Sequence, residues 1–123
     1  MPLQAMPSSQ LVQSDVADET TSSTSFVKLK EIVITQSGTY RFKYGTALDG
    51  FSTSGRAAIY RNGTIKGISR TLTFVTTFTG PTDIWIEDIG GWAKGDLAQI
   101  FALVNNASAA AHVSDYHIFG SYS

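Results

Sequence analysis

Apolar side chains recur at every second position through most of this chain, and that period of two restricts the fold more than any other feature. In TYRFKYG, for example, Tyr40, Phe42 and Tyr44 alternate with Arg41 and Lys43. Such alternation is typical of a half-buried β-strand. Turn-forming pairs interrupt the alternation every 8 to 12 residues or so, a spacing that indicates an antiparallel sandwich or barrel. The pairs are Ser37-Gly38, Asp49-Gly50, Ser54-Gly55, Asn62-Gly63, Gly80-Pro81, Gly90-Gly91, Gly95-Asp96 and Asn105-Asn106.

Four later segments extend the strand pattern. Residues 71–79 (TLTFVTTFT) and 110–120 (AAHVSDYHIFG) alternate, which predicts two further half-buried strands. Residues 82–89 (TDIWIEDI) and 96–104 (DLAQIFALV) are apolar on both faces, so we expect both to be central or packed on both sides. With about eight strands in total, we predict an all-β, antiparallel β-sandwich of the jelly-roll type. A fibronectin-like sandwich is the alternative.

The first 25 residues differ in composition from the remainder. They contain two prolines, nine Ser or Thr, three acids, no base and no aromatic residue, so they cannot bury enough apolar surface to fold alone. We predict an extended polar arm over residues 1–25 and a β-sandwich domain over 26–123. Three of the ten acids lie in the arm, so the sandwich domain carries seven acids against nine bases. This small imbalance indicates only weak attraction between arm and domain.

Overall composition limits the partners and the chemistry. A net charge of -1 leaves no excess positive charge for a nucleic-acid backbone or an anionic membrane, so we expect neither partner. The absence of cysteine excludes disulfides, thiolate metal sites and a cysteine nucleophile. No apolar run approaches the roughly 20 residues that cross a bilayer, and the N-terminus lacks the basic start and apolar run of a secretory signal.

Residues suited to catalysis are few. His112 and His117 are five positions apart in one predicted strand, so they should point to opposite faces and cannot chelate one ion together. Glu87 and Asp88 are adjacent and should also diverge. No nucleophile elbow, zinc-protease motif or phosphate-binding loop occurs, so we expect a non-enzyme without cofactor or metal. Five aspartates fit either turn capping or a loop-type calcium site: Asp49, Asp83, Asp88, Asp96 and Asp115.

Exposed aromatic rings would suit sugar binding, because they form platforms for pyranose faces. Trp92 lies in the predicted loop IGGWAKGD and is the first candidate, followed by Tyr60 and Tyr122. The polar loop residues Asn105 and Asn106 would complete such a site. Alternatively, Trp92 folds back over the open end of the sandwich, in which case it is a core residue.

Asn62-Gly63 within IYRNGTIKG supports two interpretations. The pair strongly favours a tight hairpin turn, and with Thr64 it also matches the acceptor pattern for N-linked glycans. Gly95-Asp96 is a second predicted structural turn, which redirects the chain into the following strand.

The segments YRNG, DIGGWAKGDLAQIFA and AHVSDYHIFG together resemble a β-sandwich domain that recurs in structural proteins of tailed phages and prophages. The similarity covers residues 38–120, and related patterns occur in tumour-necrosis-factor-like jelly rolls and carbohydrate-binding modules. It carries no catalytic residue. The recurrent positions are Tyr60, Asn62, Gly63, Trp92, Gly95, Asp96 and Ile118.

This resemblance implies a non-enzymatic virion component, either a capsid decoration or head-fibre protein or a tail-fibre module. We expect a homo-oligomer, a trimer, whose residues 1–25 contact the major capsid protein or a neighbouring subunit. The alternative is a carbohydrate- or receptor-binding module at a fibre tip. A secreted cytokine-like domain is disfavoured, because no export signal is recognised. Synthesis in a host cytoplasm would leave Asn62 unglycosylated, which favours the hairpin interpretation.

Overall fold

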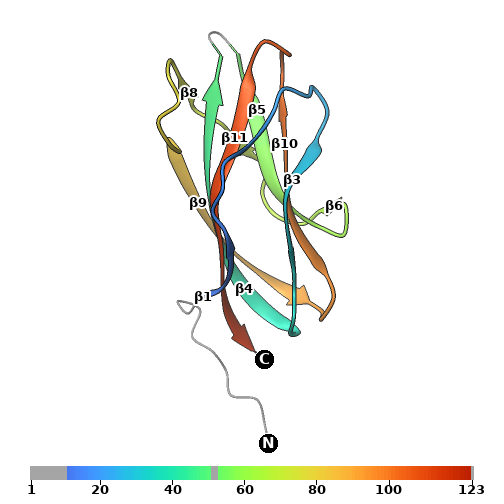
Figure 1. The fold of residues 1–123 in the computed structure, drawn as a ribbon. Helices are drawn as coiled ribbons and strands as arrows, with labels where there is room; N and C mark the ends of the chain where they lie inside the picture. Colours follow the sequence, from blue (N-terminus) through green and yellow to red (C-terminus); the bar gives the residue numbers. More distant parts are fainter. Residues whose placement is uncertain (1–10, 51–52, 123) are drawn as a thin grey trace, which may run out of the picture.

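The computed structural model describes residues 11–50 and 53–122, and its strands form two sheets packed face to face (Figure 1). The predicted all-β sandwich is therefore confirmed. The first sheet contains β1 (Leu11–Asp15), β2 (Glu19–Thr21), β4 (Gly38–Asp49), β8 (Phe74–Val75), β9 (Asp83–Trp92) and β11 (Ala110–Tyr122). The second contains β3 (Val27–Val33), β5 (Gly55–Arg61), β6 (Thr64–Ile65), β7 (Arg70–Thr71) and β10 (Leu97–Val104).

Interior strands with neighbours on both sides organise the two sheets. In the first sheet, β11 pairs with β4 on one side and with β1 and β2 on the other, always antiparallel. In the second sheet, β10 lies between β3 and β5. The prediction that residues 96–104 form a central strand is confirmed. Among the described strands, every pairing is antiparallel except the two-residue pairing of β8 with β4.

The core lies between the sheets and follows the period of two in the sequence. Tyr40, Phe42 and Tyr44 are buried, as their alternation predicts, while Arg41 and Lys43 point outward. Apolar residues of β5 and β10 meet them from the other sheet.

A buried hydrogen bond also joins the two sheets. The hydroxyl of Tyr116 on β11 donates to the Ala98 carbonyl oxygen on β10 at 3.1 Å. Its partner therefore comes from the facing sheet, and the bond fixes the position of one sheet relative to the other.

The N-terminal segment differs from its prediction as an arm. Residues 11–15 and 19–21 form β1 and β2, which extend the first sheet along β11. The fully buried ammonium group of Lys30 on β3 lies 3.0 Å from a carboxylate oxygen of Asp15 and also donates to the Ala17 carbonyl. The described part of the arm thus belongs to the sandwich, and its polar side chains contact partners inside it. Residues 1–10 lie outside the described residues.

The predicted strand over residues 71–79 is interrupted. Leu72 is buried in the core, but the chain then passes from the second sheet to the first, where β8 pairs with β4. Further along, the ring of Phe78 stacks on His112 of the first sheet, with 3.8 Å between the ring centroids. Pro81 packs closely against Gly45 on the same outer face, where an added Cβ would lie 2.6 Å from the Pro81 ring. Residues 76–82 therefore form a loop that covers part of the first sheet.

Strand β9 is not central, contrary to the prediction for residues 82–89. Within the described residues it pairs with β4 alone, and Ile84 and Ile86 remain 46% and 56% exposed on its outer face. The other apolar residues of this segment lie on the inner face of β9, where Ile89 is buried and Trp85 packs against the core.

The two histidines lie on the same face of the sheet, which corrects the expectation from their odd separation. The pairing of β11 with β4 shifts register between Ser114 and His117, where Asp115 adopts a positive φ of 54°. After this bulge, His112 pairs with Ala47 and His117 pairs with Lys43. These β4 positions are four residues, or roughly 13 Å, apart, so the histidines still do not form one metal site.

Candidate functional site

Trp92 is not an exposed platform. Its side chain is only 2% exposed, and its ring packs against Phe42 with centroids 5.2 Å apart. The alternative interpretation of Trp92 as a residue that closes the end of the sandwich is the one the structure supports. Gly91, with a positive φ of 78°, turns the backbone immediately before it.

Asn105 and Asn106 are exposed, but their hydrogen bonds organise a turn. The Asn105 side-chain oxygen accepts from the Ser54 N–H at 2.8 Å, and the Asn106 side-chain oxygen accepts from the Ser108 N–H at 2.9 Å. This turn lies at the Gly55 end of β5, roughly 20 Å along the strand from Tyr60. The structure therefore does not bring the predicted sugar-binding residues together. The side chain of Tyr122 lies outside the described side chains.

Tyr60 belongs to a cluster that the sequence did not reveal. Its ring stacks on Phe101 of β10 with centroids 4.1 Å apart and planes 14° apart, and Phe26 approaches it at 5.8 Å. All three side chains are half-buried on the outer face of the β3–β10–β5 sheet. We call Phe26, Tyr60 and Phe101 the aromatic face.

The strand register explains how this face forms. Tyr60 pairs with Gln99, and Phe101 pairs with Ala58, so Tyr60 and Phe101 are diagonal neighbours on one side of the sheet. Ala58 has a small side chain, which leaves space for the two larger rings. A register shift between β10 and β3 at Ile100 and Phe101 aligns Lys28 with Phe101 and brings the start of β3 toward the rings.

The Tyr60 hydroxyl has no hydrogen-bond partner among the described residues. Partial burial raises the pKa of this phenol, so the hydroxyl keeps its proton at neutral pH. The aromatic face therefore combines apolar ring surface with a hydroxyl that can donate and accept hydrogen bonds.

Polar groups beside the aromatic face form a connected network. The Gln99 side chain donates to Glu31 at 2.9 Å and accepts from the Gly63 N–H at 2.8 Å, and Lys28 pairs with Glu31 at 2.9 Å. The bond from Gln99, followed by that from Lys28, lowers the pKa of Glu31, which keeps it ionised at neutral pH. Because Gln99 binds the hairpin backbone, this network links the face to the β5–β6 hairpin.

The Asn62-Gly63 hairpin is confirmed. Asn62 and Gly63 have φ values of 51° and 84°, and the flanking residues Arg61 and Thr64 pair, as in a two-residue primed turn. The Asn62 side chain accepts from the Leu97 N–H at 2.8 Å and donates to Asp96 at 3.1 Å. Both polar ends of the Asn62 amide thus fasten the hairpin to the next turn.

The turn at Gly95-Asp96 is also confirmed. Gly95 has a φ of 93°, and Asp96 closes the turn by accepting from the Ala93 N–H at 2.9 Å. The bond from Ala93, then that from Asn62, lowers the pKa of Asp96. The aspartate is therefore ionised and held in place at neutral pH.

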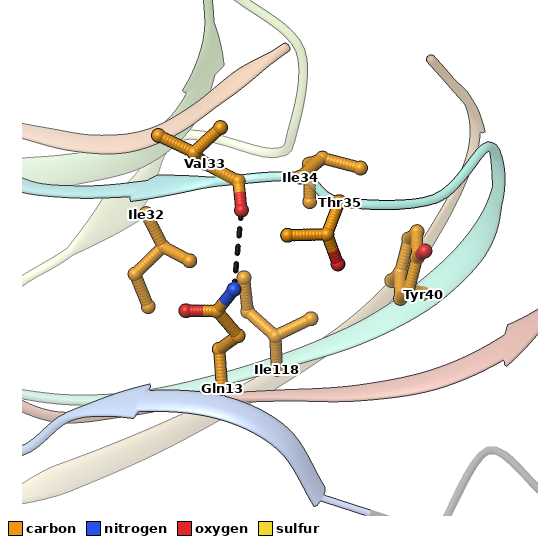
Figure 2. Close-up of a pocket in the computed structure, with 7 residues that line it drawn as sticks. All are labelled: Gln13, Ile32, Val33, Ile34, Thr35, Tyr40 and Ile118. Atoms are coloured by element: carbon orange, nitrogen blue, oxygen red, sulfur yellow. Dashed lines mark hydrogen bonds between the residues drawn. The ribbon is translucent and has the colours of Figure 1, made fainter. Parts of the chain in front are cut away.

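A small cavity lies between β1 and the end of β3. Its volume is about 10 Å³, so it holds about one water molecule and is too small for a sugar. Figure 2 shows the Gln13 side chain reaching across it to donate to the Val33 carbonyl oxygen at 3.3 Å. The remaining lining residues are Ile32, Ile34, Thr35, Tyr40 and Ile118.

The candidate acids hold structural positions. Asp88 forms a 2.8 Å ion pair with Arg41 on the outer face, whereas Glu87 points inward and lies 3.6 Å from Arg70. Their divergence is as expected for adjacent strand residues.

The described ranges contain no group of three or more His, Asp or Glu side chains placed to hold a metal ion. They also contain no helix long and apolar enough to span a membrane.

Phe26 and Phe101 are the candidate site residues that sequence reasoning missed. Phe101 belongs to a strand that is apolar on both faces, so its pattern did not separate the outer face from the core. Phe26 immediately precedes β3 and lies far from Tyr60 in sequence. Only the order and register of β3, β10 and β5 place the three rings together.

The similarity that comparisons with known proteins reveal is structural. No protein-family model and no curated protein sequence matches the chain. Among solved structures, a carbohydrate-binding module from the Cellvibrio mixtus lichenase 5A, solved in complex with cellotriose, is similar with a TM-score of 0.47 and 13% sequence identity. The similarity covers 99% of this chain and 100% of that chain.

Proposed function

We propose that this protein is a non-enzymatic binding module that holds a glycan on its aromatic face. The observation that carries the proposal is the cluster of Phe26, Tyr60 and Phe101, half-buried on the outer side of a sheet whose inner side already forms the core. Apolar ring surface of this kind stacks against the C–H face of a pyranose. The unpartnered Tyr60 hydroxyl is available to bond a sugar hydroxyl.

The platform is preorganised, which lowers the entropic cost of binding. Stacking between Tyr60 and Phe101 restricts both rings, and the Gln99 network fixes the backbone of the adjacent hairpin. A ligand would therefore meet a surface that needs little rearrangement. Rigid strands position the rings, so binding should not require loop closure.

A glycan array followed by isothermal titration calorimetry tests the proposal. We expect Phe101→Ala to reduce affinity at least tenfold, since it removes the ring on which Tyr60 stacks. Tyr60→Phe keeps the ring and removes the hydroxyl, so we expect a smaller loss, about two- to tenfold.

Phe119→Ala is the matched control, because Phe119 is a half-buried aromatic residue on the outer face of the other sheet. Equal loss of affinity in Phe119→Ala and Phe101→Ala would contradict the assignment to the aromatic face. Absence of binding to every glycan tested, by a folded protein, would overturn the proposed function.

Assembly into a virion as a homo-oligomer is a second candidate function. The phage-protein resemblance implies it, and the free edge of β9, with exposed Ile84 and Ile86, is the observation that favours a subunit contact. A long edge strand with outward apolar side chains is a template for pairing with another chain. The trimer, the capsid contact of residues 1–25 and the virion location stay predictions.

Light scattering coupled to size-exclusion chromatography checks the oligomer. We expect the wild type to run as an oligomer at micromolar concentration and Ile86→Lys to shift it toward the monomer. A wild type that remains monomeric and binds no particle would count against assembly without affecting the glycan proposal.

A further inference from the structure

Strand register places a carboxylate and a guanidinium on the same face of the sheet as the three rings. Gln99 of β10 pairs with Glu31 on one side and with Tyr60 on the other, so these residues form one row across the outer face. Arg56 precedes Tyr60 by four residues on β5, whose pairing with β10 has no register shift, so both side chains point outward. The aromatic face therefore has one acidic and one basic neighbour.

The two charged residues lie on opposite sides of the Phe101 ring. Glu31, on β3, pairs with Gln99, which precedes Phe101 by two residues. Arg56, on β5, pairs with Leu103, which follows Phe101 by two residues. The Cα atoms of Glu31 and Arg56 are thus separated by roughly 10 Å across the strands and roughly 13 Å along them. A glycan lying on the rings would pass between a carboxylate and a guanidinium.

Glu31 has one carboxylate oxygen without a hydrogen-bond partner among the described residues. Both of its hydrogen bonds end on Oε1, one from the Lys28 ammonium at 2.9 Å and one from the Gln99 amide at 2.9 Å. These two bonds hold the carboxylate in place. Oε2 is therefore a fixed acceptor beside the rings, and it can accept a charge-assisted hydrogen bond.

The Arg56 guanidinium is oriented in a similar way. Its Nε donates to the Ser69 hydroxyl oxygen at 2.8 Å, whereas Nη1 and Nη2 have no acceptor in the described ranges. No Asp or Glu of the described part of the chain forms an ion pair with it. The two terminal nitrogens are therefore available as donors of charge-assisted hydrogen bonds.

We propose that the glycan is a neutral polysaccharide whose hydroxyl groups bind Glu31 on one side of the rings and Arg56 on the other. This inference rests on the function proposed above. Oε2 of Glu31 accepts from a sugar hydroxyl, and the Arg56 guanidinium donates to a sugar oxygen. A hydroxyl suits both side chains, because it donates and accepts. A sugar carboxylate can only accept, so it cannot use Glu31.

Native gels that contain a polysaccharide test the class of ligand. The neutral probes are galactomannan, xyloglucan and mixed-linkage β-glucan, and polygalacturonate is the acidic comparison. We expect at least one neutral polymer to retard the wild type more than polygalacturonate does. Retardation by polygalacturonate alone would overturn the inference and leave the proposed function standing. The same holds if none of the three neutral polymers binds while other glycans bind on the array.

The O-methyl ether of the bound polymer separates the roles of the two side chains, because it lacks hydroxyl donors but keeps oxygen acceptors. In calorimetry, we expect Glu31→Gln to lower affinity for the free polymer about fivefold, since a neutral amide replaces a charged acceptor. Its affinity for the ether should equal that of the wild type. Arg56→Gln should lower affinity for both polymers, because the methylated oxygens still accept.

Asp88→Asn and Arg41→Gln are the matched controls, because this ion-paired carboxylate and guanidinium lie on the outer face of the other sheet. We expect neither to change affinity, with thermal denaturation confirming that all four variants are folded. Losses as large as those of Glu31→Gln and Arg56→Gln would contradict the assignment. An equal loss for polymer and ether in Glu31→Gln would also contradict it, since the effect would then be indirect. If no glycan binds at all, the proposed function itself fails.

Discussion

Gly63 adopts a backbone conformation that other residues reach at a cost. Its φ is 84°, a left-handed value, and an added Cβ would meet no atom within 4 Å. Substitution therefore acts through backbone strain alone. The Gly63 N–H also donates to Gln99, so a shift of this residue would reach the network beside the aromatic face.

We expect Gly63→Val to lower the free energy of unfolding by about 1–3 kcal/mol, because a β-branched residue is strained at positive φ. Gly63→Asn is the control, since asparagine tolerates this region far better. Urea denaturation of both variants checks the difference. Equal stabilities for the two would contradict the backbone explanation.

Three surface carboxylates should make the protein sensitive to acid. Hydrogen bonds lower the pKa of Glu31 through Gln99, of Asp88 through Arg41 and of Asp96 through Ala93. A carboxyl whose pKa is lower in the folded state stabilises the fold above its unfolded pKa, about 4, and loses that contribution as pH falls through the folded value.

Urea denaturation across a pH series checks this linkage. We expect stability to stay level from neutral pH to about pH 5 and to decline below about pH 4. Asp96→Asn keeps a side-chain acceptor but cannot ionise, so its stability should decline less steeply with acid. A decline as steep as that of the wild type would contradict a contribution from Asp96.

At the scale of the element, β1 depends on a charge buried beneath it. The Lys30 side chain is fully buried, while its partner Asp15 on β1 remains 42% exposed. Removing Asp15 would leave the ammonium group buried without its counter-ion, which is more costly than replacing both groups by apolar ones. The ion pair therefore makes the docking of β1 specific.

A double-mutant cycle measures this coupling. We expect Asp15→Ala to lower the free energy of unfolding by about 2 kcal/mol or more, and Lys30→Met to lower it less, because methionine fills the site without a charge. In the double variant, Asp15→Ala should have little further effect. Additive losses in denaturant unfolding would show that the two side chains do not act together.

The elements also show how far the sequence predicts this fold. Period-two alternation identified β4 and β11, an apolar run bounded by turn residues identified β10, and Asn-Gly chemistry identified the hairpin, because these depend on local sequence. Residues 11–21 were misassigned because their partners, Lys30 and His112, are distant in sequence. The outward position of Ile84 and Ile86 likewise reflects the place of β9 at a sheet edge, which alternation does not encode.

The candidate site was predicted less well than the fold, for a related reason. Tyr60 was identified, but Trp92 was buried by tertiary packing, and Asn105 and Asn106 serve a turn at the other end of β5. Exposure of a loop aromatic depends on which way the chain closes the end of the sandwich. To predict a surface formed by three strands, the order of those strands must be known, and only the folded structure gives it.

At the scale of the whole molecule, residues 11–21 are part of one cooperative body. Besides β1 and β2 pairing with β11, the Asp18 carboxylate lies 2.9 Å from the His112 ring nitrogen. We expect a chain beginning at residue 22 to unfold at a markedly lower temperature than one beginning at residue 11, because Lys30 and His112 lose their partners. Calorimetry of the two chains checks this, and equal melting temperatures would contradict the role of these strands.

Strand β11 has a consequence for how the protein is made. It is the last strand in sequence, yet three strands of the first sheet, β1, β2 and β4, hydrogen-bond to it. During synthesis, β1, β2 and β4 emerge well before the strand that joins them, so they must remain unpaired with it until residues 110–122 leave the ribosome. Translation products that stop before residue 110 would lack the centre of this sheet and become substrates for proteases and chaperones.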